Sequence, residues 1–415
     1  MSARRAEESS TADNFLVARG KAPSSDEDAG FAVTPAARPA AVARGESGPW
    51  APTTLDRIAP FRRILWVTRW DFNSPEDIRR ICYNAASARF TDILFQVRGA
   101  GTVFYNSRIE PWAGELSGSP VGAIGRDPGW DPLAVAVRES HKMGLRLHAY
   151  MNALPGWGAQ EETPSASSGQ LFAIHRSWFM VNAAGRTMRP GSSYCFLDPG
   201  LPQVRAYLAK LYGEVAEHYA VDGVHLDYIR YPDERGDYSY HPRVLETFES
   251  LFGGRPSQQP ESWAQFRRNQ ITETVRTIAR AVHAARPKTE VSAAVVADRS
   301  RQTNVCYQSA LEWVRGGELD AIAPMAYSGE MDKFDELCQP YRADDVRKRV
   351  WLGVWADPKR NSHLEAEVRR AAGMGFGAVA VFSYSELFPE HRASSRATCV
   401  YQAFTSKRTT LSQAF

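Results

Sequence analysis

One pattern repeats along the chain from residue 61 onward: a short apolar run, a loop, and then a stretch with helical spacing. The runs are rich in β-branched and aromatic residues, and apolar strands that alternate with helices are typical of a parallel sheet covered on both faces. We predict eight strands, over residues 64–70, 92–98, 146–152, 223–229, 291–298, 321–327, 351–357 and 378–384.

The stretches between the runs carry helix signals. Ser74 precedes Pro75 and two acidic residues, which is the pattern of an N-cap and a first helical turn. Pro202 opens another stretch whose apolar residues recur at helical spacing. Eight strand–helix units match a (β/α)8 TIM barrel. A doubly wound sheet is the alternative, but its glycine-rich first turn is missing, since residues 70–74 contain no glycine.

We therefore expect an α/β protein with a (β/α)8 barrel over residues 61–390. Residues 1–60 are rich in Ala, Ser, Pro, Arg and Glu, which predicts a disordered segment or linker. Residues 391–415 are expected to form a C-terminal helix and tail. Three long loops, 99–130, 153–200 and 231–262, follow the second, third and fourth strands. They lie at the end of the barrel where active sites sit, and loops of this length are usually functional.

Composition excludes several classes of protein. The 50 Lys and Arg nearly balance 47 Asp and Glu, so no basic surface for nucleic acid is expected. No apolar run reaches the roughly 20 residues of a membrane span. The five cysteines form no C-x-x-C pair, which argues against a disulfide framework or a zinc site. No cofactor is expected. The first residues lack the apolar stretch of a secretory signal, so localisation stays open: cytoplasmic as written, exported if the true start lies upstream.

The fourth strand carries the main catalytic candidate. Side chains alternate along a strand, so His225 and Asp227 share one face while Val224 and Leu226 share the other. The apolar pair suits the helix layer, which places Asp227 inside the barrel at its C-terminal rim. A carboxylate there is costly to desolvate unless it is paired or functional. A salt bridge with Arg98 or Arg230 is the structural alternative.

Other strands place polar and aromatic residues at the same rim. Amides and charges can bind sugar hydroxyls, and aromatic rings can stack on the apolar face of a pyranose. A lone His or Tyr is, however, more often a hydrogen-bonded core residue. The loop aromatics are open to two interpretations, as plugs over the barrel end or as walls of a sugar cleft. The candidate substrate-binding residues are Gln96, Arg98, Tyr105, Trp112, His148, Asn152, His225, Tyr228, Arg230, Tyr327, Trp355 and Tyr384.

Residues 222–232, Asp-Gly-Val-His-Leu-Asp-Tyr-Ile-Arg-Tyr-Pro, resemble the signature of the glycosyl hydrolase-like 10 family. Residues 65–68, 95–99, 127–133, 148–152, 197–200 and 322–327 also resemble stretches of the family. The resemblance covers about residues 61 to 390. It implies a TIM barrel related to bacterial cell-envelope glycosidases, in which Asp227 is the central acid. Some members carry a second acid directly after this Asp, whereas this chain has Tyr228.

The expected activity is cleavage of O-glycosidic bonds in a poly- or oligosaccharide, with a peptidoglycan-derived glycan as one candidate. Such hydrolysis ordinarily uses two carboxyl groups, about 5–5.5 Å apart for retention and about 6.5–9.5 Å apart for inversion. Asp298, which closes the fifth strand, and Glu330, which follows the sixth, are the preferred partners of Asp227, because adjacent strands bring their ends closest; either could instead cap a helix. Asp71, Asp357 and Glu386 also lie at this end. A Tyr nucleophile or assistance from a substrate acetamido group are further routes.

Three other functions compete with this one. A non-catalytic carbohydrate-binding barrel is the main alternative, and it predicts no second carboxylate across the cleft from Asp227. A metal-dependent hydrolase needs clustered ligands, whereas the nine histidines are scattered. A phosphate-binding barrel would use the seventh and eighth loops, where acidic residues repel phosphate.

Overall fold

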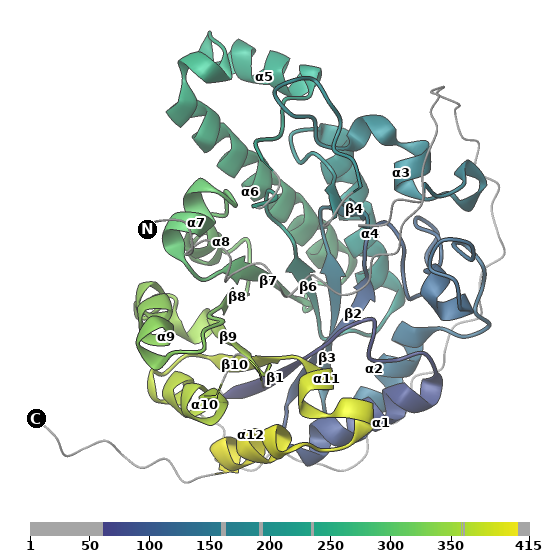
Figure 1. Ribbon diagram of the computed structural model, residues 1–415, viewed down its shortest axis with the longest axis vertical. Coiled ribbons are helices and arrows are strands. Elements are labelled where there is room, and N and C mark those ends of the chain that lie inside the picture. The colour runs from purple at the N-terminus through teal and green to yellow at the C-terminus, as the bar shows by residue number, and fades with distance from the viewer. Residues whose placement is uncertain are drawn as a thin grey trace, which may run out of the picture.

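The computed structural model describes residues 61–158, 163–190, 194–233, 236–357, 359 and 362–405. Eight parallel strands form a closed barrel in the order β1, β2, β3, β6, β7, β8, β9, β10, with β10 paired to β1 (Figure 1). The predicted α/β barrel is confirmed. Its strands are β1 (Arg62–Val67), β2 (Asp92–Arg98), β3 (Arg146–Asn152), β6 (Gly223–Asp227), β7 (Glu290–Val296), β8 (Ala321–Met325), β9 (Trp351–Trp355) and β10 (Ala378–Phe382).

Several strands end earlier than predicted. β1 ends at Val67 instead of residue 70, because the Asp71 carboxylate accepts hydrogen bonds from the backbone N–H of Thr68 at 2.6 Å and its hydroxyl at 3.0 Å. These bonds turn the chain out of the sheet. The residues after β1, β6, β8, β9 and β10 therefore belong to loops around the barrel mouth, where side chains no longer alternate strictly.

Helices surround the barrel (Figure 1). The outer helices are α1 (Pro75–Ser87), α2 (Pro132–Lys142), α4 (Pro202–His218), α6 (Pro260–Ala285), α8 (Ala310–Arg315), α9 (Met331–Cys338), α10 (Leu364–Gly373) and α12 (Ser395–Thr405). The predicted starts of α1 and α4 are confirmed: the Ser74 hydroxyl accepts from the backbone N–H of Asp77 at 3.2 Å, and Pro202 opens α4. The predicted disordered segment over residues 1–60, and the tail after residue 405, lie outside the described residues.

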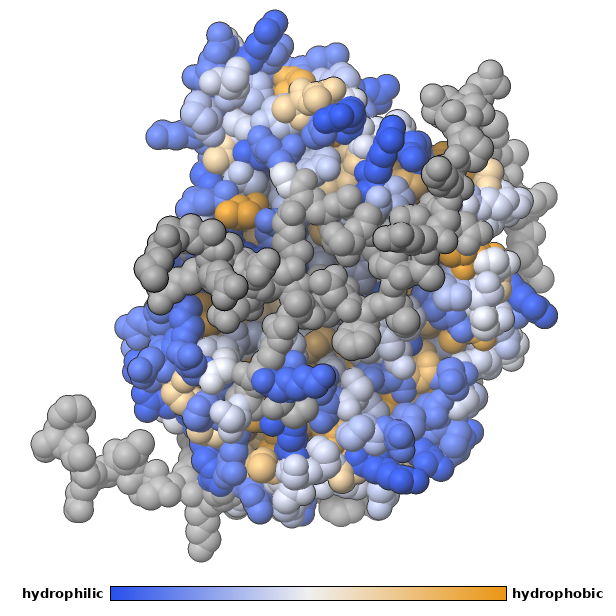
Figure 2. All heavy atoms as spheres, viewed as in Figure 1, coloured by the Kyte–Doolittle hydropathy of each residue, from blue (hydrophilic) through white to orange (hydrophobic). Residues whose placement is uncertain are grey.

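The loops that follow the strands carry their own elements. These are β4 (Pro155–Trp157), paired antiparallel with β5 (Cys195–Phe196), and the helices α3 (Leu171–Ile174), α5 (Pro242–Phe252), α7 (Arg299–Asn304) and α11 (Tyr384–Leu387). Single 3-10 turns occupy Gly114–Ser117, Ala166–Ser168, Arg176–Trp178, Pro256–Gln258, Gln339–Tyr341, Arg347–Arg349 and Pro389–His391. At the top of Figure 1, α5 projects beyond the barrel. Where Figure 2 is coloured, this face is mostly hydrophilic, with apolar residues in separate small groups.

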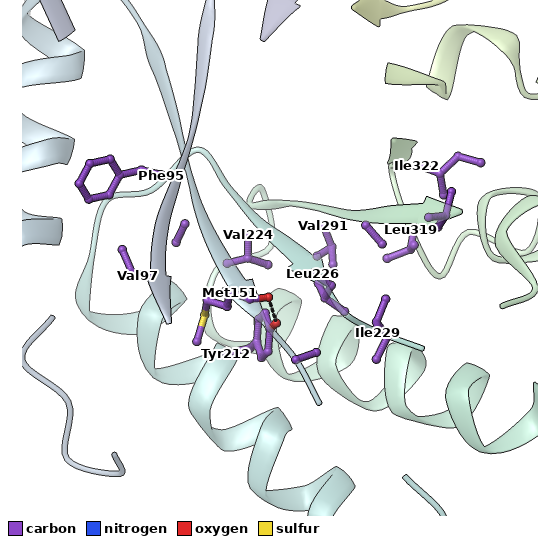
Figure 3. Close-up of a cluster of buried hydrophobic side chains, with 14 of the residues drawn as sticks. Phe95, Val97, Met151, Tyr212, Val224, Leu226, Ile229, Val291, Leu319 and Ile322 are labelled. Atoms are coloured by element: carbon purple, nitrogen blue, oxygen red, sulfur yellow. Dashed lines mark hydrogen bonds between the residues drawn. The ribbon is translucent and has the colours of Figure 1, made fainter. Parts of the chain in front are cut away.

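Two apolar layers follow from strand alternation. Val224 and Leu226 point outward into the core beneath the helices, as predicted, and Figure 3 shows part of this layer. There the Tyr212 hydroxyl of α4 donates to the Met151 carbonyl at 2.9 Å. Inside the barrel, large rings alternate with alanines, so the interior is filled and forms no pore. The residues of this inner cluster are Ile64, Trp66, Leu94, Tyr150, Ala294, Ala321, Ala323, Trp351, Ala378 and Ala380.

A network of ion pairs closes the N-terminal end of the barrel. Asp92 of β2 is fully buried and bonds Arg62 of β1 and His148 of β3, the latter at 3.3 Å. Glu290 of β7 pairs with Arg62 at 2.9 Å and with Arg146 at 3.0 Å. Burial alone would raise the pKa of Asp92, but hydrogen bonds from His148 and Arg62 hold it well below its usual value. The network therefore ties four strands together through two anions, the buried Asp92 and the partly exposed Glu290.

We expect Asp92→Asn to lower the free energy of unfolding by about 3 kcal/mol at pH 7, because it removes the buried counter-charge of Arg62. The folded state depresses the pKa of this carboxyl, so its stabilisation is present above the unfolded-state pKa of about 3.9 and is lost as the pH falls below it. Urea unfolding between pH 3 and pH 8 measures this, with exposed Asp332→Asn as control. Equal stability of Asp92→Asn and wild type at pH 7 would contradict the assignment.

The structure describes no helix that is long and apolar enough to span a bilayer.

Candidate functional site

Asp227 is the last residue of β6 and lies at the C-terminal mouth of the barrel, with 8% of its surface exposed. Its Oδ2 accepts a hydrogen bond from the Tyr150 hydroxyl at 3.0 Å. Its Oδ1 accepts from the backbone N–H of Tyr228 at 2.7 Å, and Arg230 Nη1 lies 3.6 Å from the same oxygen. The carboxylate thus faces two donors and one cation.

The backbone directly after Asp227 adopts an unusual conformation that accompanies the hydrogen bond from the Tyr228 N–H. Tyr228 has a φ of +48°, in the left-handed region that bulky residues rarely adopt. Such a conformation costs on the order of 1–3 kcal/mol and is found most often at functional sites. It accompanies the turn in which the Tyr228 N–H donates to Asp227. The Arg230 guanidinium then stacks on the Tyr228 ring, with its Cζ 4.2 Å from the ring centroid.

Two amides lie beside this group. Asn152 ends β3 directly opposite Asp227 in the sheet register, and its Oδ1 accepts from Gln96 Nε2 at 3.3 Å. Gln96 Oε1 in turn accepts from the backbone N–H of Arg69 at 3.0 Å. Both amides are buried, and within the described part of the chain Asn152 Nδ2 has no hydrogen-bond partner. An unpaired, buried donor therefore lies next to the carboxylate.

Aromatic rings from three other strand ends form a group at the mouth. Tyr327, two residues beyond β8, has its ring centroid 5.8 Å from that of Trp355, which ends β9. Phe382 ends β10, and its ring lies 5.9 Å from that of Tyr327. All three side chains are partly exposed. Such rings could pack against the apolar face of a sugar.

The predicted second acids are placed in different ways. Asp298 follows β7 and caps α7, where its Oδ1 accepts from the backbone N–H of Arg301 at 2.9 Å. Glu330 is exposed at the start of α9. Asp71 is half-buried after β1, and burial raises its pKa to about 6. Asp71 can therefore hold a proton at mildly acidic pH.

Three predicted binding residues lie in internal networks. Arg98 is fully buried and forms a two-bonded ion pair with Glu110, at 2.8 and 2.7 Å, while its Nη1 donates to carbonyls of the loop after β3. His148 belongs to the ion-pair network at the N-terminal end. Tyr105 is also fully buried, with its hydroxyl 3.4 Å from Glu214. The structure does not bring these three side chains to Asp227.

Three further candidates lie in different places: one in the barrel interior, one in the loop after β2 and one on the outer side of the strands. His225 lies in the barrel interior with Nδ1 2.9 Å from Ser292 Oγ, and burial lowers its pKa to about 3, so the ring is neutral. Trp112 is half-buried in the loop after β2. Tyr384 is buried, and its hydroxyl accepts from Asn84 of α1 at 2.9 Å on the outer side of the strands.

Two loop tryptophans act as plugs. Trp157 is 3% exposed and stacks on Phe172, with ring centroids 6.1 Å apart. Trp178 stacks on His175 at 4.0 Å and contacts Tyr207 of α4. For these two tryptophans, the contacts favour a role in loop packing over a role in lining a sugar-binding cleft.

Two residues that contribute to the mouth were not among the predicted site residues. Tyr150 shares the inward face of β3 with Asn152, and the sheet register that sets Asn152 against Asp227 is what brings its hydroxyl within reach. Arg69 follows β1 and hydrogen-bonds Tyr194 at 3.1 Å. Its partner comes from the distant loop after β3, so no local pattern could reveal the contact. The described residues include no group of three or more His, Cys, Asp or Glu arranged to hold a metal.

Known proteins share this architecture. The glycoside hydrolase domain of PgaB (BpsB) from Bordetella bronchiseptica superposes with a TM-score of 0.62 at 13% identity, covering 84% of this chain and all of that domain. The catalytic domain of β-amylase from Paenibacillus polymyxa has a TM-score of 0.58 at 10% identity, covering 83% of this chain and 97% of that domain. At such low identity these likenesses show the fold alone.

Curated relatives are closer in sequence. The glycosyl hydrolase DigH of Escherichia coli K12 is 28% identical over 290 residues, which are 63% of this chain and 61% of DigH. The glycosyl hydrolase YngK of Bacillus subtilis is 26% identical over 267 residues, 61% of this chain and 47% of YngK. The matched part of the chain thus covers less than two thirds of the length of these relatives. The family model described as glycosyl hydrolase-like 10 matches residues 62–350, so the chain belongs to the glycosyl hydrolase-like 10 family.

Proposed function

We propose that the protein is a glycoside hydrolase that cleaves O-glycosidic bonds in a poly- or oligosaccharide, with Asp227 as its central carboxylate. The observation that carries the proposal is the setting of Asp227: partly exposed at the mouth, bonded by Tyr150 and Tyr228, and adjacent to Arg230. A buried carboxylate is costly unless it is compensated. Here the compensation holds it at the C-terminal mouth, with 8% of its surface exposed.

The same contacts assign a chemical state to Asp227. Tyr150 and Tyr228 donate hydrogen bonds to it, and Arg230 is a nearby cation, so each of these three contacts favours the ionised form. Burial and the nearby Asp227 raise the pKa of Tyr150 well above its usual value, so its hydroxyl stays protonated and remains a donor. Asp227 therefore serves as the anionic partner, attacking the sugar, activating water or stabilising positive charge on the sugar ring.

A second group must then protonate the leaving oxygen. Asp298 and Glu330 remain our candidates, since they follow the two strands next along the barrel from β6. Asp71 joins them because its raised pKa suits a proton donor. Single Asp298→Asn, Glu330→Gln and Asp71→Asn variants distinguish the three: loss of the donor slows substrates with poor leaving groups more than substrates with good ones.

Groups suited to bind a sugar surround Asp227. Asn152 Nδ2 and Arg230 Nη1 are buried donors without hydrogen-bond partners among the described residues. Hydroxyl oxygens of a substrate would satisfy both. The Tyr327 and Trp355 rings supply an apolar surface for a pyranose. The combination matches a carbohydrate, which presents hydroxyls at its edge and C–H groups on its face.

A non-catalytic carbohydrate-binding barrel is the second candidate. It is favoured by the fact that Asp298 is engaged as a helix cap and Glu330 is exposed at a helix start. This candidate predicts that the wild-type protein binds glycans and releases no products. Incubation with a panel of polysaccharide and peptidoglycan fragments, with products followed by NMR, separates the two functions and gives the stereochemistry of cleavage.

On a substrate found by that screen, we expect Asp227→Asn to lower kcat by about 10³-fold or more, because the neutral amide cannot replace the anion. The side chain keeps its size and both donors can still reach its oxygen, so the melting temperature should stay close to that of wild type. Steady-state kinetics and thermal unfolding of the same preparation measure both quantities. Full turnover by Asp227→Asn would show that the assignment is wrong.

We expect Tyr150→Phe to move the acidic limb of the kcat/KM pH profile up by about one pH unit. Removing a donor to a charged group costs about 1.5–3 kcal/mol, and the carboxylate then takes up its proton at higher pH. Tyr327→Phe is the matched control, since no hydrogen bond joins it to Asp227 among the described residues. A profile that only falls in height, without moving along the pH axis, would contradict the ionised state assigned to Asp227.

A further inference from the structure

Trp70 is an exposed aromatic residue that the proposed chemistry does not use. It follows β1 at the C-terminal end of the barrel, and 60% of its surface is exposed. Among the described residues no other tryptophan is exposed to this degree. The ring thus lies at the same end of the barrel as Asp227, with a large apolar surface open to solvent.

The ring is held in place from one side. The Arg69 guanidinium stacks on it, with its Cζ 4.4 Å from the ring centroid. Arg69 itself lies against the backbone of Gly99, where an added Cβ would come within 3.0 Å of Arg69 Nε. Gly99, Arg69 and Trp70 therefore form a stack of three layers. Because Arg69 covers one face of the indole, its exposed area lies mainly on the other face.

The stack continues toward the carboxylate. Arg69 Nη2 donates to the Tyr194 hydroxyl at 3.1 Å, and the Tyr194 ring contacts the Tyr228 ring with centroids 5.2 Å apart. Tyr228 follows Asp227 directly and donates its backbone N–H to it. Arg69 is also close enough to Tyr150 to act on its hydroxyl electrostatically. A continuous series of side-chain contacts therefore connects Trp70 to Asp227.

We propose that Trp70 is the platform of a distal sugar subsite, on which a pyranose ring of the substrate stacks away from the bond that is cleaved. The ligand class is an extended glycan chain that runs from the Asp227 mouth across Arg69 to Trp70, rather than a mono- or disaccharide. This inference rests on the proposed function, because it places Trp70 and Asp227 on one continuous substrate.

The chemistry of the ring matches this occupant. A sugar ring offers C–H groups to an aromatic face and hydroxyls at its edge, so it can cover the indole while its polar groups stay hydrated. The position fits as well, because a chain threaded past Asp227 needs contacts on either side of the cleaved bond. Trp70 provides such a contact on the β1 side, whereas Tyr327 and Trp355 lie on the β8 and β9 side.

The test is affinity electrophoresis of the full chain in native gels that contain glycol chitin, hydroxyethyl cellulose or soluble peptidoglycan strands. Trp70→Ala should weaken retention by about tenfold in the gel that retains the wild type. Trp70→Phe keeps a ring and should retain most of the binding. Tyr83→Ala removes an aromatic ring of similar exposure from α1 and should change nothing.

Oligosaccharides of the retained polymer, two and six sugars long, give the second readout. Trp70→Ala should raise KM for the six-sugar chain about tenfold and leave the two-sugar fragment unchanged. Equal behaviour of Trp70→Ala and wild type on both lengths would overturn the subsite alone. Equal losses of glycan binding in Trp70→Ala and Tyr83→Ala would also overturn the subsite alone. No retention or cleavage of any glycan by the wild type would overturn the proposed function and the subsite with it.

Discussion

A carboxylate at the rim of a packed barrel must be compensated by donors, and this requirement organises the mouth of the protein. Asp227 lies at the C-terminal end of the barrel interior and is 8% exposed, so water cannot solvate its carboxylate fully. Tyr150, the strained backbone of Tyr228, and Arg230 each compensate part of its charge. Arg230 is held by stacking on Tyr228, so the groups that stabilise the anion also hold one another.

The two ends of the barrel use buried charge differently. At the N-terminal end, Asp92 is enclosed by Arg62 and His148, with Glu290 balancing the cations. Both carboxylates there are paired with arginines, and Asp92 also with His148, as in a network that stabilises the fold. At the C-terminal end, Asp227 keeps 8% of its surface exposed, and the adjacent Asn152 Nδ2 has no hydrogen-bond partner among the described residues. This asymmetry is what we expect if one end maintains the barrel and the other binds a ligand.

Much of the fold could be predicted from local patterns. The apolar runs identified all eight strands, and alternation correctly separated Val224 and Leu226, which face the helices, from His225, which faces the interior. The strand ends were less predictable, because a side chain beyond the run decides them, as Asp71 does for β1.

The site was only partly predictable for a related reason. Arg98 and His148 have the polar character of binding residues, but their partners Glu110 and Asp92 come from other segments, and a pattern along one strand cannot show them. The stack of Arg69 on Trp70, with its bond to Tyr194, joins the loop after β1 to a loop more than a hundred residues away. Such contacts exist only once the barrel has closed.

The most direct measurement is a crystal structure of Asp227→Asn bound to an oligosaccharide of a proven substrate. The account predicts a glycosidic bond beside residue 227, with a second carboxyl group about 5–9.5 Å away across that bond. An oligosaccharide bound elsewhere on the protein, or a mouth in which residue 227 is covered by side chains and reaches no sugar, would contradict it.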